Sequence, residues 1–287
     1  MEKKETEALT EGALCGEFYV GEGKKVRFSK GNLQFNAVQG THKTDDDELP
    51  GTWRFAEHQW DVIGKDNEKI SETYDGFVDL FRWGASGWWC GTKCCQPWSV
   101  SEECDSGYDY YVALYGWINN LTGKCENCDW GCYNAISNGG DEPGLWRTLE
   151  CDEWAYLFEH NKWTIGKIDG QLCCLLIPEN VSGLKEAEYD DEGGYYYEIV
   201  DAELESNAFT AEQFKKYEEQ GVVALPCGGY MKYPSVKECA EAGYYWSVNA
   251  AEDDEIVGVK VYSTGVIRNT DDTSRTWNCS VRLVQDV

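Results

Sequence analysis

The C-terminal segment of this chain opens with Gly243-Tyr244-Tyr245-Trp246-Ser247 and closes with Ser280-Val281-Arg282-Leu283-Val284. Both ends are rich in β-branched and aromatic residues, a composition typical of strands. The residues between them are polar, and runs such as Glu252-Asp253-Asp254-Glu255 offer little to a core. A rigid apolar frame that holds a long polar insert is the layout of a recognition surface. The segment therefore predicts a binding site.

Four strands are expected in this segment: Tyr244–Asn249, Ile256–Tyr262, Gly265–Arg268 and Cys279–Gln285. In the second of them, Val257, Val259 and Val261 alternate with Gly258, Lys260 and Tyr262. Successive side chains of a strand point to opposite faces, so the valines should face the core and the other three the solvent.

Two helices are predicted upstream. The first runs from about Cys151 to His160, where Trp154, Leu157 and Phe158 form one apolar stripe. The second begins at Thr210-Ala211-Glu212-Gln213, which has the capping-box pattern, with Phe209 and Phe214 placed for a hydrophobic staple. Many short strands separated by loops accompany these helices, so the fold class is α+β.

A single domain is expected over 17–287, preceded by a charged, flexible tail over 1–16. From about 84 to 132 the sequence is rich in Gly, Trp and Cys with little periodicity, which indicates a surface insertion within that domain.

The net charge of −27 disfavours partners that carry phosphate, so neither nucleic acid nor an anionic membrane surface is expected. No apolar run reaches the roughly 20 residues that a membrane-spanning helix needs, so no membrane insertion is expected. Residues Met1 to Glu11 lack the apolar stretch of a signal peptide. The location of the protein stays open on this ground.

The 14 cysteines include a group with metal-ligand spacing. Cys125-x-x-Cys128 is followed by Cys132, and Cys90-x-x-x-Cys94 supplies further thiols, which makes structural zinc a hypothesis. The alternative is an insertion with ordinary thiols or local disulfides. The acidic loops also offer the oxygen ligands of a structural calcium ion.

Several blocks resemble one group of bacterial proteins common in gut Bacteroidales. The matching blocks are Val26–Phe35, Trp53–Gln59, Tyr133–Gly140, Gly144–Leu149, Asp152–Trp154 and the frame from Tyr244 to Val284. The group resembles the C-type lectin fold, in the branch that includes formylglycine-generating enzymes. Some members look like the variable proteins of diversity-generating retroelements, whose C-terminal segment is hypermutated to vary a ligand-binding face. The resemblance implies this fold, ligand binding, and a cell-surface or secreted location.

The chain departs from the group in places. Glu150 stands where Thr usually caps the Asp-Glu-Trp helix, which predicts a weaker cap. Asn278 replaces a usual Gly, and the Cys-rich insertion has no counterpart. The polar insert is dominated by Asp, Glu, Val and Thr rather than the Asn, Asp, Ser, Thr and Tyr typical of retroelement mutagenesis.

The resemblance also names an enzymatic alternative. Formylglycine-generating enzymes bind copper through two closely spaced C-terminal cysteines, whereas this segment has Cys279 alone. His58 lies in a family block, and we expect a hydrogen-bonded core residue rather than a base. Calcium-dependent sugar binding is disfavoured because Glu142-Pro143-Gly144 and Trp277-Asn278-Cys279 each lack one ligand of the usual motifs.

The leading prediction is therefore a non-enzymatic receptor or adhesin for a protein or carbohydrate ligand on a cell or phage surface. The alternatives are an oxidase relative with displaced chemistry and a structural phage-tail or cell-surface adhesin. The predicted binding face comprises Asn249, Asp253, Asp254, Lys260, Tyr262, Asp271, Asp272, Thr273, Arg275, Thr276, Trp277 and Asn278. Stacking on Trp277 and Tyr262 and polar contacts from Arg275 would bind the ligand. For Trp277, core packing is the alternative.

Overall fold

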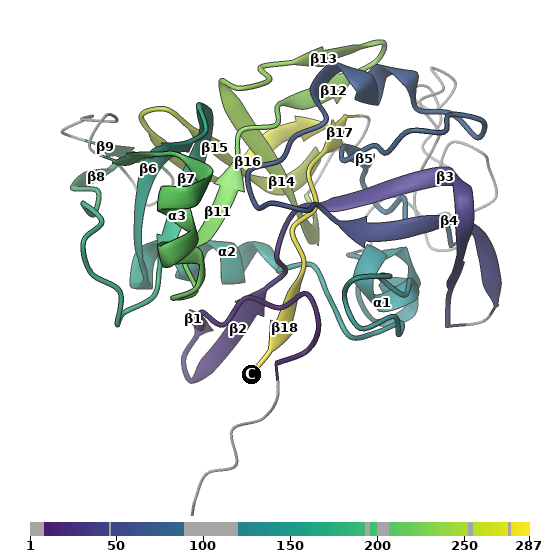
Figure 1. Cartoon of the computed structure of the whole chain (residues 1–287), viewed down its shortest axis with the longest axis horizontal. Helices are drawn as coiled ribbons and strands as arrows, with labels where there is room; N and C mark the ends of the chain where they lie inside the picture. The colour runs from purple at the N-terminus through teal and green to yellow at the C-terminus, as the bar shows by residue number, and fades with distance from the viewer. Residues whose placement is uncertain are drawn as a thin grey trace, which may run out of the picture.

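The computed structural model describes residues 9–45, 47–88, 120–192, 196–199, 207–251, 255–274 and 277–287. Helices and strands are mixed, with most strands in several small sheets, so the predicted α+β class is confirmed (Figure 1).

The helices are α1 (Trp130–Tyr133), α2 (Cys151–His160) and α3 (Ala211–Glu218), with 3₁₀ turns η1 (Gly64–Lys69) and η5 (Gly123–Cys128). The strands up to α3 are β1 (Phe18–Gly21), β2 (Lys24–Phe28), β3 (Leu33–Lys43), β4 (Glu48–Phe55), β5 (Phe81–Arg82), β6 (Lys162–Ile168), β7 (Gln171–Ile177), β8 (Tyr189–Glu192), β9 (Tyr196–Ile199) and β10 (Ala208–Phe209). The later strands are β11 (Val223–Pro226), β12 (Tyr230–Lys232), β13 (Ser235–Lys237), β14 (Ala242–Ala250), β15 (Glu255–Tyr262), β16 (Gly265–Ser274), β17 (Asn278–Cys279) and β18 (Val284–Asp286).

Strand β14 separates two hydrophobic cores. Every residue from 242 to 248 is buried, and alternate side chains go to opposite sides. Tyr244 and Trp246 join one core, which also holds the aromatic residues of β3 and β4. Tyr245 joins the other core, beneath α2. A strand that is apolar on both faces belongs inside a molecule rather than at its surface.

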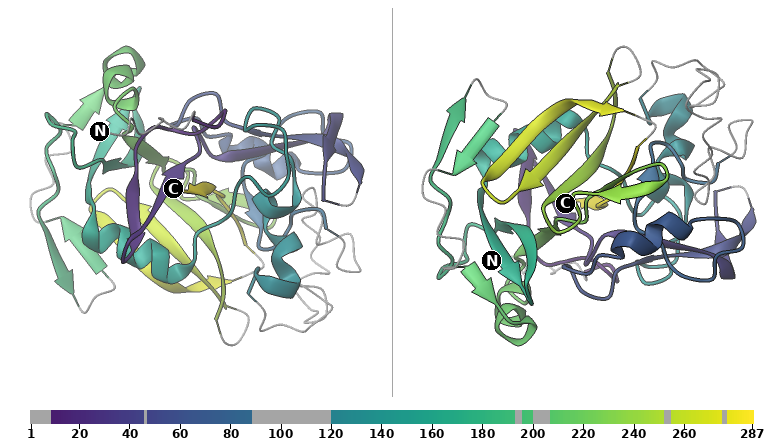
Figure 2. Two further views of the ribbon diagram at one scale, coloured as in Figure 1. Left: turned by 90° about the horizontal axis from the view of Figure 1, so that it is seen from below. Right: turned by 90° about the horizontal axis from the view of Figure 1, so that it is seen from above.

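The sheet that contains β14 has the order β14-β15-β16-β9-β8, with antiparallel neighbours. Figure 2 shows these strands as one curved layer, with α2 lying against the face that carries the second core. Val259 and Val261 are buried, as the valine alternation predicted, whereas Val257 is half-buried. Gly258, expected to face the solvent, is buried, and the pairing of β15 with β16 is irregular on both sides of it. Strand β16 continues to Ser274, well past the predicted end at Arg268.

Helix α2 has the bounds that the apolar stripe predicts, and its Trp154 and Phe158 rings are stacked 6.2 Å apart. The Glu150 side chain forms no hydrogen bond as an N-cap, in line with the weaker cap expected where threonine is missing. The Glu150 backbone N–H donates to Glu153 Oε2 at 3.0 Å, so the carboxylate of Glu153 still holds the helix start.

Helix α3 confirms its predicted start. Thr210 Oγ1 accepts from the Gln213 N–H at 3.2 Å, and Gln213 Oε1 accepts from the Thr210 N–H at 2.8 Å. The Phe209 and Phe214 rings lie 6.2 Å apart, as a staple requires. The helix packs with β7 and β11 in a third core. Strand β7 lies between β6 and β11 and is almost fully buried.

The predicted tail is wrong for its second half. Leu14 is buried, and its N–H donates to the Phe28 carbonyl at 2.9 Å. Gly16 packs so closely on Gly221 that an added Cβ would lie 2.1 Å from the Gly221 oxygen. The charge of this segment and its lack of periodicity predicted a flexible tail, because the contacts that hold residues 9–16 are made mainly by the backbone. Residues 1–8 lie outside the described part.

A buried carboxylate fixes η1 against the strand that follows it. Asp79 Oδ1 accepts from Asn67 Nδ2 at 2.8 Å, and Asp79 Oδ2 accepts from the Ile63 N–H at 2.9 Å. Asn67 Oδ1 in turn accepts from the N–H groups of Asp79 and Leu80. Burial raises the pKa of Asp79 to about 6, although these hydrogen bonds oppose the shift.

This shift predicts a pH-dependent stability. A folded pKa above the unfolded value of 3.8 means that the folded state binds the proton more tightly. The contribution is therefore fully present below pH 3.8 and is lost as the pH rises through about 6, by about 3 kcal/mol in all. We expect Asp79→Asn to lower stability but to remove this decline when urea unfolding is compared from pH 4 to 7. The exposed Asp66→Asn is the control, and equal pH slopes for wild type and Asp79→Asn would contradict the assignment.

Candidate functional site

Three aromatic residues from separate parts of the chain meet beside the C-terminal sheet. Tyr230 of β12 stacks on Trp277, which precedes β17, with ring centroids 4.1 Å apart and planes at 22°. Tyr244 of β14 meets the Tyr230 ring edge-on at 4.8 Å. Tyr230 and Trp277 are half-buried and pack against the rim of the first core. Each therefore keeps part of its ring at the surface.

Charged groups lie on the same face because of the strand register. Lys260 of β15 is paired with Tyr244, and its Nζ lies 4.9 Å from the centre of that ring. The same Nζ is 3.1 Å from Glu238 Oε2 and 6.0 Å from the Tyr262 ring. The Tyr244 hydroxyl donates to Glu238 Oε2 at 2.8 Å. We call Tyr230, Glu238, Tyr244, Lys260, Tyr262 and Trp277 the aromatic–charged cluster.

The surroundings of Tyr230 and Tyr244 favour the protonated form of both phenols. Burial, followed by the hydrogen bond and charge of Glu238, raises the pKa of Tyr244. Burial also raises the pKa of Tyr230, with a smaller contribution from Glu238. Both phenols therefore remain neutral hydrogen-bonding groups on aromatic faces at physiological pH, a form suited to recognition rather than to proton transfer.

The structure brings together three of the predicted face residues, Lys260, Tyr262 and Trp277. Sequence reasoning missed Tyr230, Glu238 and Tyr244. Tyr244 was assigned to the frame because it lies in an apolar run. It both packs in the first core and belongs to the aromatic–charged cluster. Tyr230 and Glu238 belong to a short hairpin whose position depends on tertiary contacts, so no local signal could have placed them here.

Two predicted face residues are buried, and their assignment to an outward face is wrong. Asn278 is 2% exposed because β17 is paired on both sides, with β12 and with β5. Its Nδ2 points to the Leu80 carbonyl at 3.5 Å. Thr273 is also 2% exposed, because β16 continues through it and pairs it with Ile256.

The remaining predicted residues have mixed outcomes. Asn249 is half-buried, and its Oδ1 accepts from the Cys151 N–H at 2.7 Å, so it helps to fix the start of α2. Asp271 and Asp272 lie in β16, whose backbone alone is described there. Asp253, Asp254, Arg275 and Thr276 lie outside the described residues, and their predicted role stays untested.

The described residues do not form the cluster of ligands that the zinc and calcium hypotheses require. Cys90 and Cys94 lie outside them. Cys125 and Cys128 are buried in the first core, and burial followed by the nearby Asp129 raises the pKa of the half-buried Cys132. Among the residues described, no group of three or more His, Cys, Asp or Glu side chains could hold zinc or calcium.

The structure also shows the surroundings of Cys279 and His58, the two residues considered for an enzymatic role. Cys279 is fully buried, and burial raises its pKa well above the usual range. His58 is exposed, stacks on Trp60 at 5.0 Å and lies 3.2 Å from Asp61 Oδ2, so the expectation that it is a core residue is wrong. Its neighbours fix the ring from outside the core.

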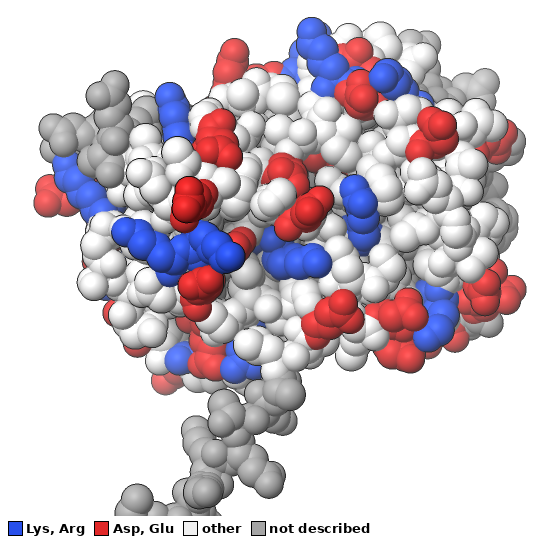
Figure 3. Space-filling model, viewed as in Figure 1, with Lys and Arg blue, Asp and Glu red and all other residues white. Residues whose placement is uncertain are grey.

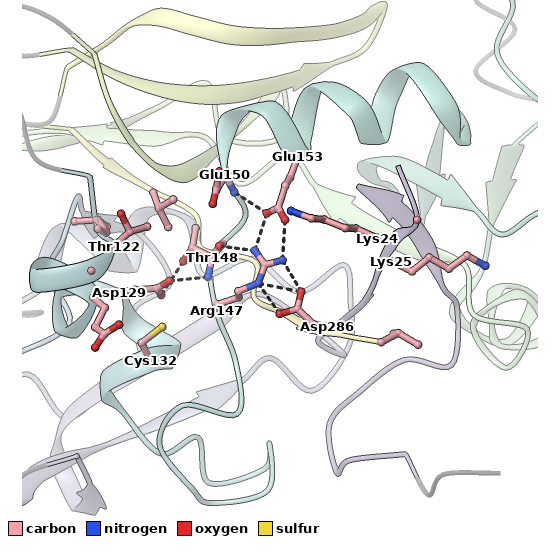
Figure 4. A pocket seen from close by; sticks show the side chains of 16 residues that line it. Lys24, Lys25, Thr122, Asp129, Cys132, Arg147, Thr148, Glu150, Glu153 and Asp286 are labelled. Atoms are coloured by element: carbon pink, nitrogen blue, oxygen red, sulfur yellow. Dashed lines mark hydrogen bonds and ion pairs between the residues drawn. The ribbon is translucent and has the colours of Figure 1, made fainter. Parts of the chain in front are cut away.

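A separate hollow of about 480 Å³ is lined by Arg147 and several carboxylates (Figure 4). Arg147 Nη1 and Nη2 donate to the two oxygens of Glu153 at 2.6 and 2.8 Å, and Nη2 lies 2.6 Å from Asp286 Oδ1. Burial disfavours the charge of Arg147, but the hydrogen bonds with Glu153 and Asp286 prevail and raise its pKa. Asp129, fully buried beneath the hollow, accepts from Thr148. These pairs fasten α2 to the C-terminal strand β18.

The two carboxylates that bind Arg147 should contribute unequally. Glu153 is 11% exposed, so Glu153→Gln weakens a pair shielded from water and should lower the free energy of unfolding by about 2 kcal/mol. Asp286 is 71% exposed, so Asp286→Asn, the matched control, should change it by less than about 0.5 kcal/mol. Urea unfolding at pH 7 measures both. Equal losses would contradict the importance of burial.

Comparison with known proteins adds no relative: no family model, no curated protein and no solved structure matches the chain. Within the described ranges, none of the helices has the length and apolar character needed to cross a membrane.

Proposed function

We propose that this protein is a non-enzymatic, ligand-binding protein of receptor or adhesin type. In this proposal the chain has a C-type lectin-like fold of the formylglycine-generating-enzyme-like branch. Its C-terminal segment is a variable recognition surface of the kind that diversity-generating retroelements modify. The ligand is a protein or carbohydrate on a cell or phage surface, and the protein acts at the cell surface or after secretion.

The observation that carries this proposal is the aromatic–charged cluster. Tyr and Trp provide large, rigid contact area at a low cost in conformational entropy, which is why they dominate binding hot spots. Here the Tyr230–Trp277 stack and the edge of Tyr244 already fix one another, so little further ordering is needed on binding. Lys260 and Glu238 add directional polar contacts at the rim of these rings.

The frame supports a variable surface in physical terms. Strands β15 and β16 place one face on the second core through Val259, Val261 and Val266, which fixes their position whatever the opposite face carries. Thr273 of the insert is 2% exposed and belongs to the interior, so it is not free to vary. A change among the residues that face outward from these strands would alter the surface without moving the frame, which is the condition for a tolerant recognition segment.

The charge distribution fits a partner other than nucleic acid. On the face shown in Figure 3, Lys and Arg side chains are interspersed with Asp and Glu, without a continuous basic patch. Together with the net charge of −27, this gives no electrostatic attraction for a phosphate backbone.

The oxidase alternative is less well supported. The copper site of that enzyme class uses two closely spaced thiols, whereas Cys279 is the single cysteine of the segment from Gly243 to Val284 and is fully buried. Burial raises the pKa of Cys239, in a half-buried position. The adhesin alternative differs from the proposal only in assembly, since a structural adhesin would be found in oligomers or attached to a larger particle.

We expect the aromatic–charged cluster to dominate binding on a printed glycan array and on an array of bacterial and phage surface proteins. Trp277→Ala should weaken binding to any ligand found with wild type by at least about tenfold, since hot-spot aromatics contribute 2 kcal/mol or more. Lys260→Ala should weaken it by a smaller factor. Binding constants measured by surface plasmon resonance on the ligands found would test both.

The matched controls lie elsewhere on the surface. Trp60 is also half-buried and stacked on a neighbouring ring, and Lys25 Nζ lies 4.4 Å from the Tyr19 ring. Trp60→Ala and Lys25→Ala should bind ligand as wild type does. If Trp277→Ala binds as tightly as Trp60→Ala, the cluster is not the recognition site.

A further inference from the structure

An arginine lies in the core without a carboxylate beside it. Arg282 is 1% exposed, and its acceptors are neutral: Nη1 donates to Ala224 O at 3.2 Å and to Asn32 Oδ1 at 3.4 Å, and Nη2 donates to Gln59 Oε1 at 3.0 Å. Among the described residues, no Asp or Glu forms an ion pair with Arg282. Glu218 is linked to it only through Gln59, whose Nε2 donates to Glu218 Oε1 at 3.1 Å.

This side chain remains charged. Burial lowers the pKa of Arg282 to about 10, against the opposing effects of Tyr245, Cys173 and Glu218. A pKa of about 10 still leaves the guanidinium protonated at pH 7. An ion buried without a counter-charge is expensive, because neutral acceptors replace only part of its hydration.

Two buried atoms beside this charge lack an acceptor, and both can donate. They are Arg282 Nε and Ser280 Oγ, and each of these residues is 1% exposed. Asn32 Nδ2 is not a third, because the Tyr245 hydroxyl accepts from it while donating to Pro226 O at 2.7 Å. Buried donors without acceptors are rare in native proteins, so two beside one cation point to a missing acceptor.

The backbone places both donors on one side. Cys279, Val281 and Leu283 face the first core, so Ser280 and Arg282, which alternate with them, project to the opposite side. There is also space beside Ser280: a Cβ added to Gly228 would meet only Ser280 Oγ and Val62, at 3.5 Å or more.

We propose that a small monovalent inorganic anion, of the size of chloride or bromide, binds between Ser280 and Arg282 as the internal counter-ion of this core. An anion accepts from both donors and compensates the charge of Arg282, whereas a water molecule would satisfy hydrogen bonds but leave that charge without a counter-ion. The space beside Ser280 would take a methyl-sized group, which suits an ion as small as a halide. The ion links the segment from Ser280 to Arg282 with strand β11 and with the chain at Gly228.

Thermal unfolding in different sodium salts tests the proposal. At constant ionic strength, wild type in sodium chloride or bromide should melt at a higher temperature than in sodium gluconate, and the rise should saturate with halide concentration. Ser280→Ala removes one donor and should weaken the apparent halide affinity about tenfold. Ser86→Ala, another buried serine whose Oγ donates to the Asn127 carbonyl, should keep the wild-type halide dependence.

Crystals grown in sodium bromide give a second readout that does not depend on a variant that folds. An anomalous peak within hydrogen-bond distance of Arg282 Nε and Ser280 Oγ is expected. Equal melting temperatures in halide and gluconate would overturn the proposal. So would an unchanged halide dependence in Ser280→Ala, or density at the site without an anomalous signal, which would be water.

Discussion

The structure depends on the register of β14. Two hydrogen bonds from neighbouring side chains fix it from opposite faces: Trp246 Nε1 donates to the Phe81 carbonyl at 2.6 Å, and the Tyr245 hydroxyl donates to the Pro226 carbonyl at 2.7 Å. Both rings are almost fully buried. A slip by one residue would exchange the two faces of the strand, leaving two polar groups unpaired and two large rings in the wrong core.

The surface follows from this register. With β14 fixed, Lys260 stands opposite Tyr244 and Tyr262 opposite Ala242, on the side away from α2. The first core ends at this rim, where Trp277 and Tyr230 cover it and remain partly exposed. The aromatic residues that close the core are therefore the same ones that are offered to a partner, and this explains why one segment is both frame and surface.

Sequence patterns correctly predicted the features that depend on neighbouring residues, such as a helix cap and the buried face of a strand. Thr210 and Gln213 predicted a capping box, and the alternation of Val259 and Val261 predicted the buried face of β15, because those signals lie within a few residues. Burial that depends on distant partners was missed. Asn278 is polar in sequence but lies between two strands, and the charged N-terminal residues give no hint of the contact between Gly16 and Gly221.

The candidate site shows the same division. Lys260 and Tyr262 could be assigned to the outward face from their period in the strand. Tyr230 and Glu238 could not, since their hairpin reaches this face through pairings with distant segments, namely the bridge of Gly229 to Gly243 and the pairing of β12 with β17. At the start of α2, the missing threonine correctly predicted that the side chain of residue 150 does not cap the helix, whereas the hydrogen bond from the Glu150 N–H to Glu153 was not predicted.

Nuclear Overhauser effects between ring and side-chain protons test the register most directly. With β14 as described, the Tyr244 ring should show cross-peaks to Lys260 and Trp277, and the Tyr245 ring should show them to Trp154. Cross-peaks from Tyr244 to the methyl groups of Val259 or Val261 instead would mean that the faces are exchanged. That result would remove the basis for the outward cluster.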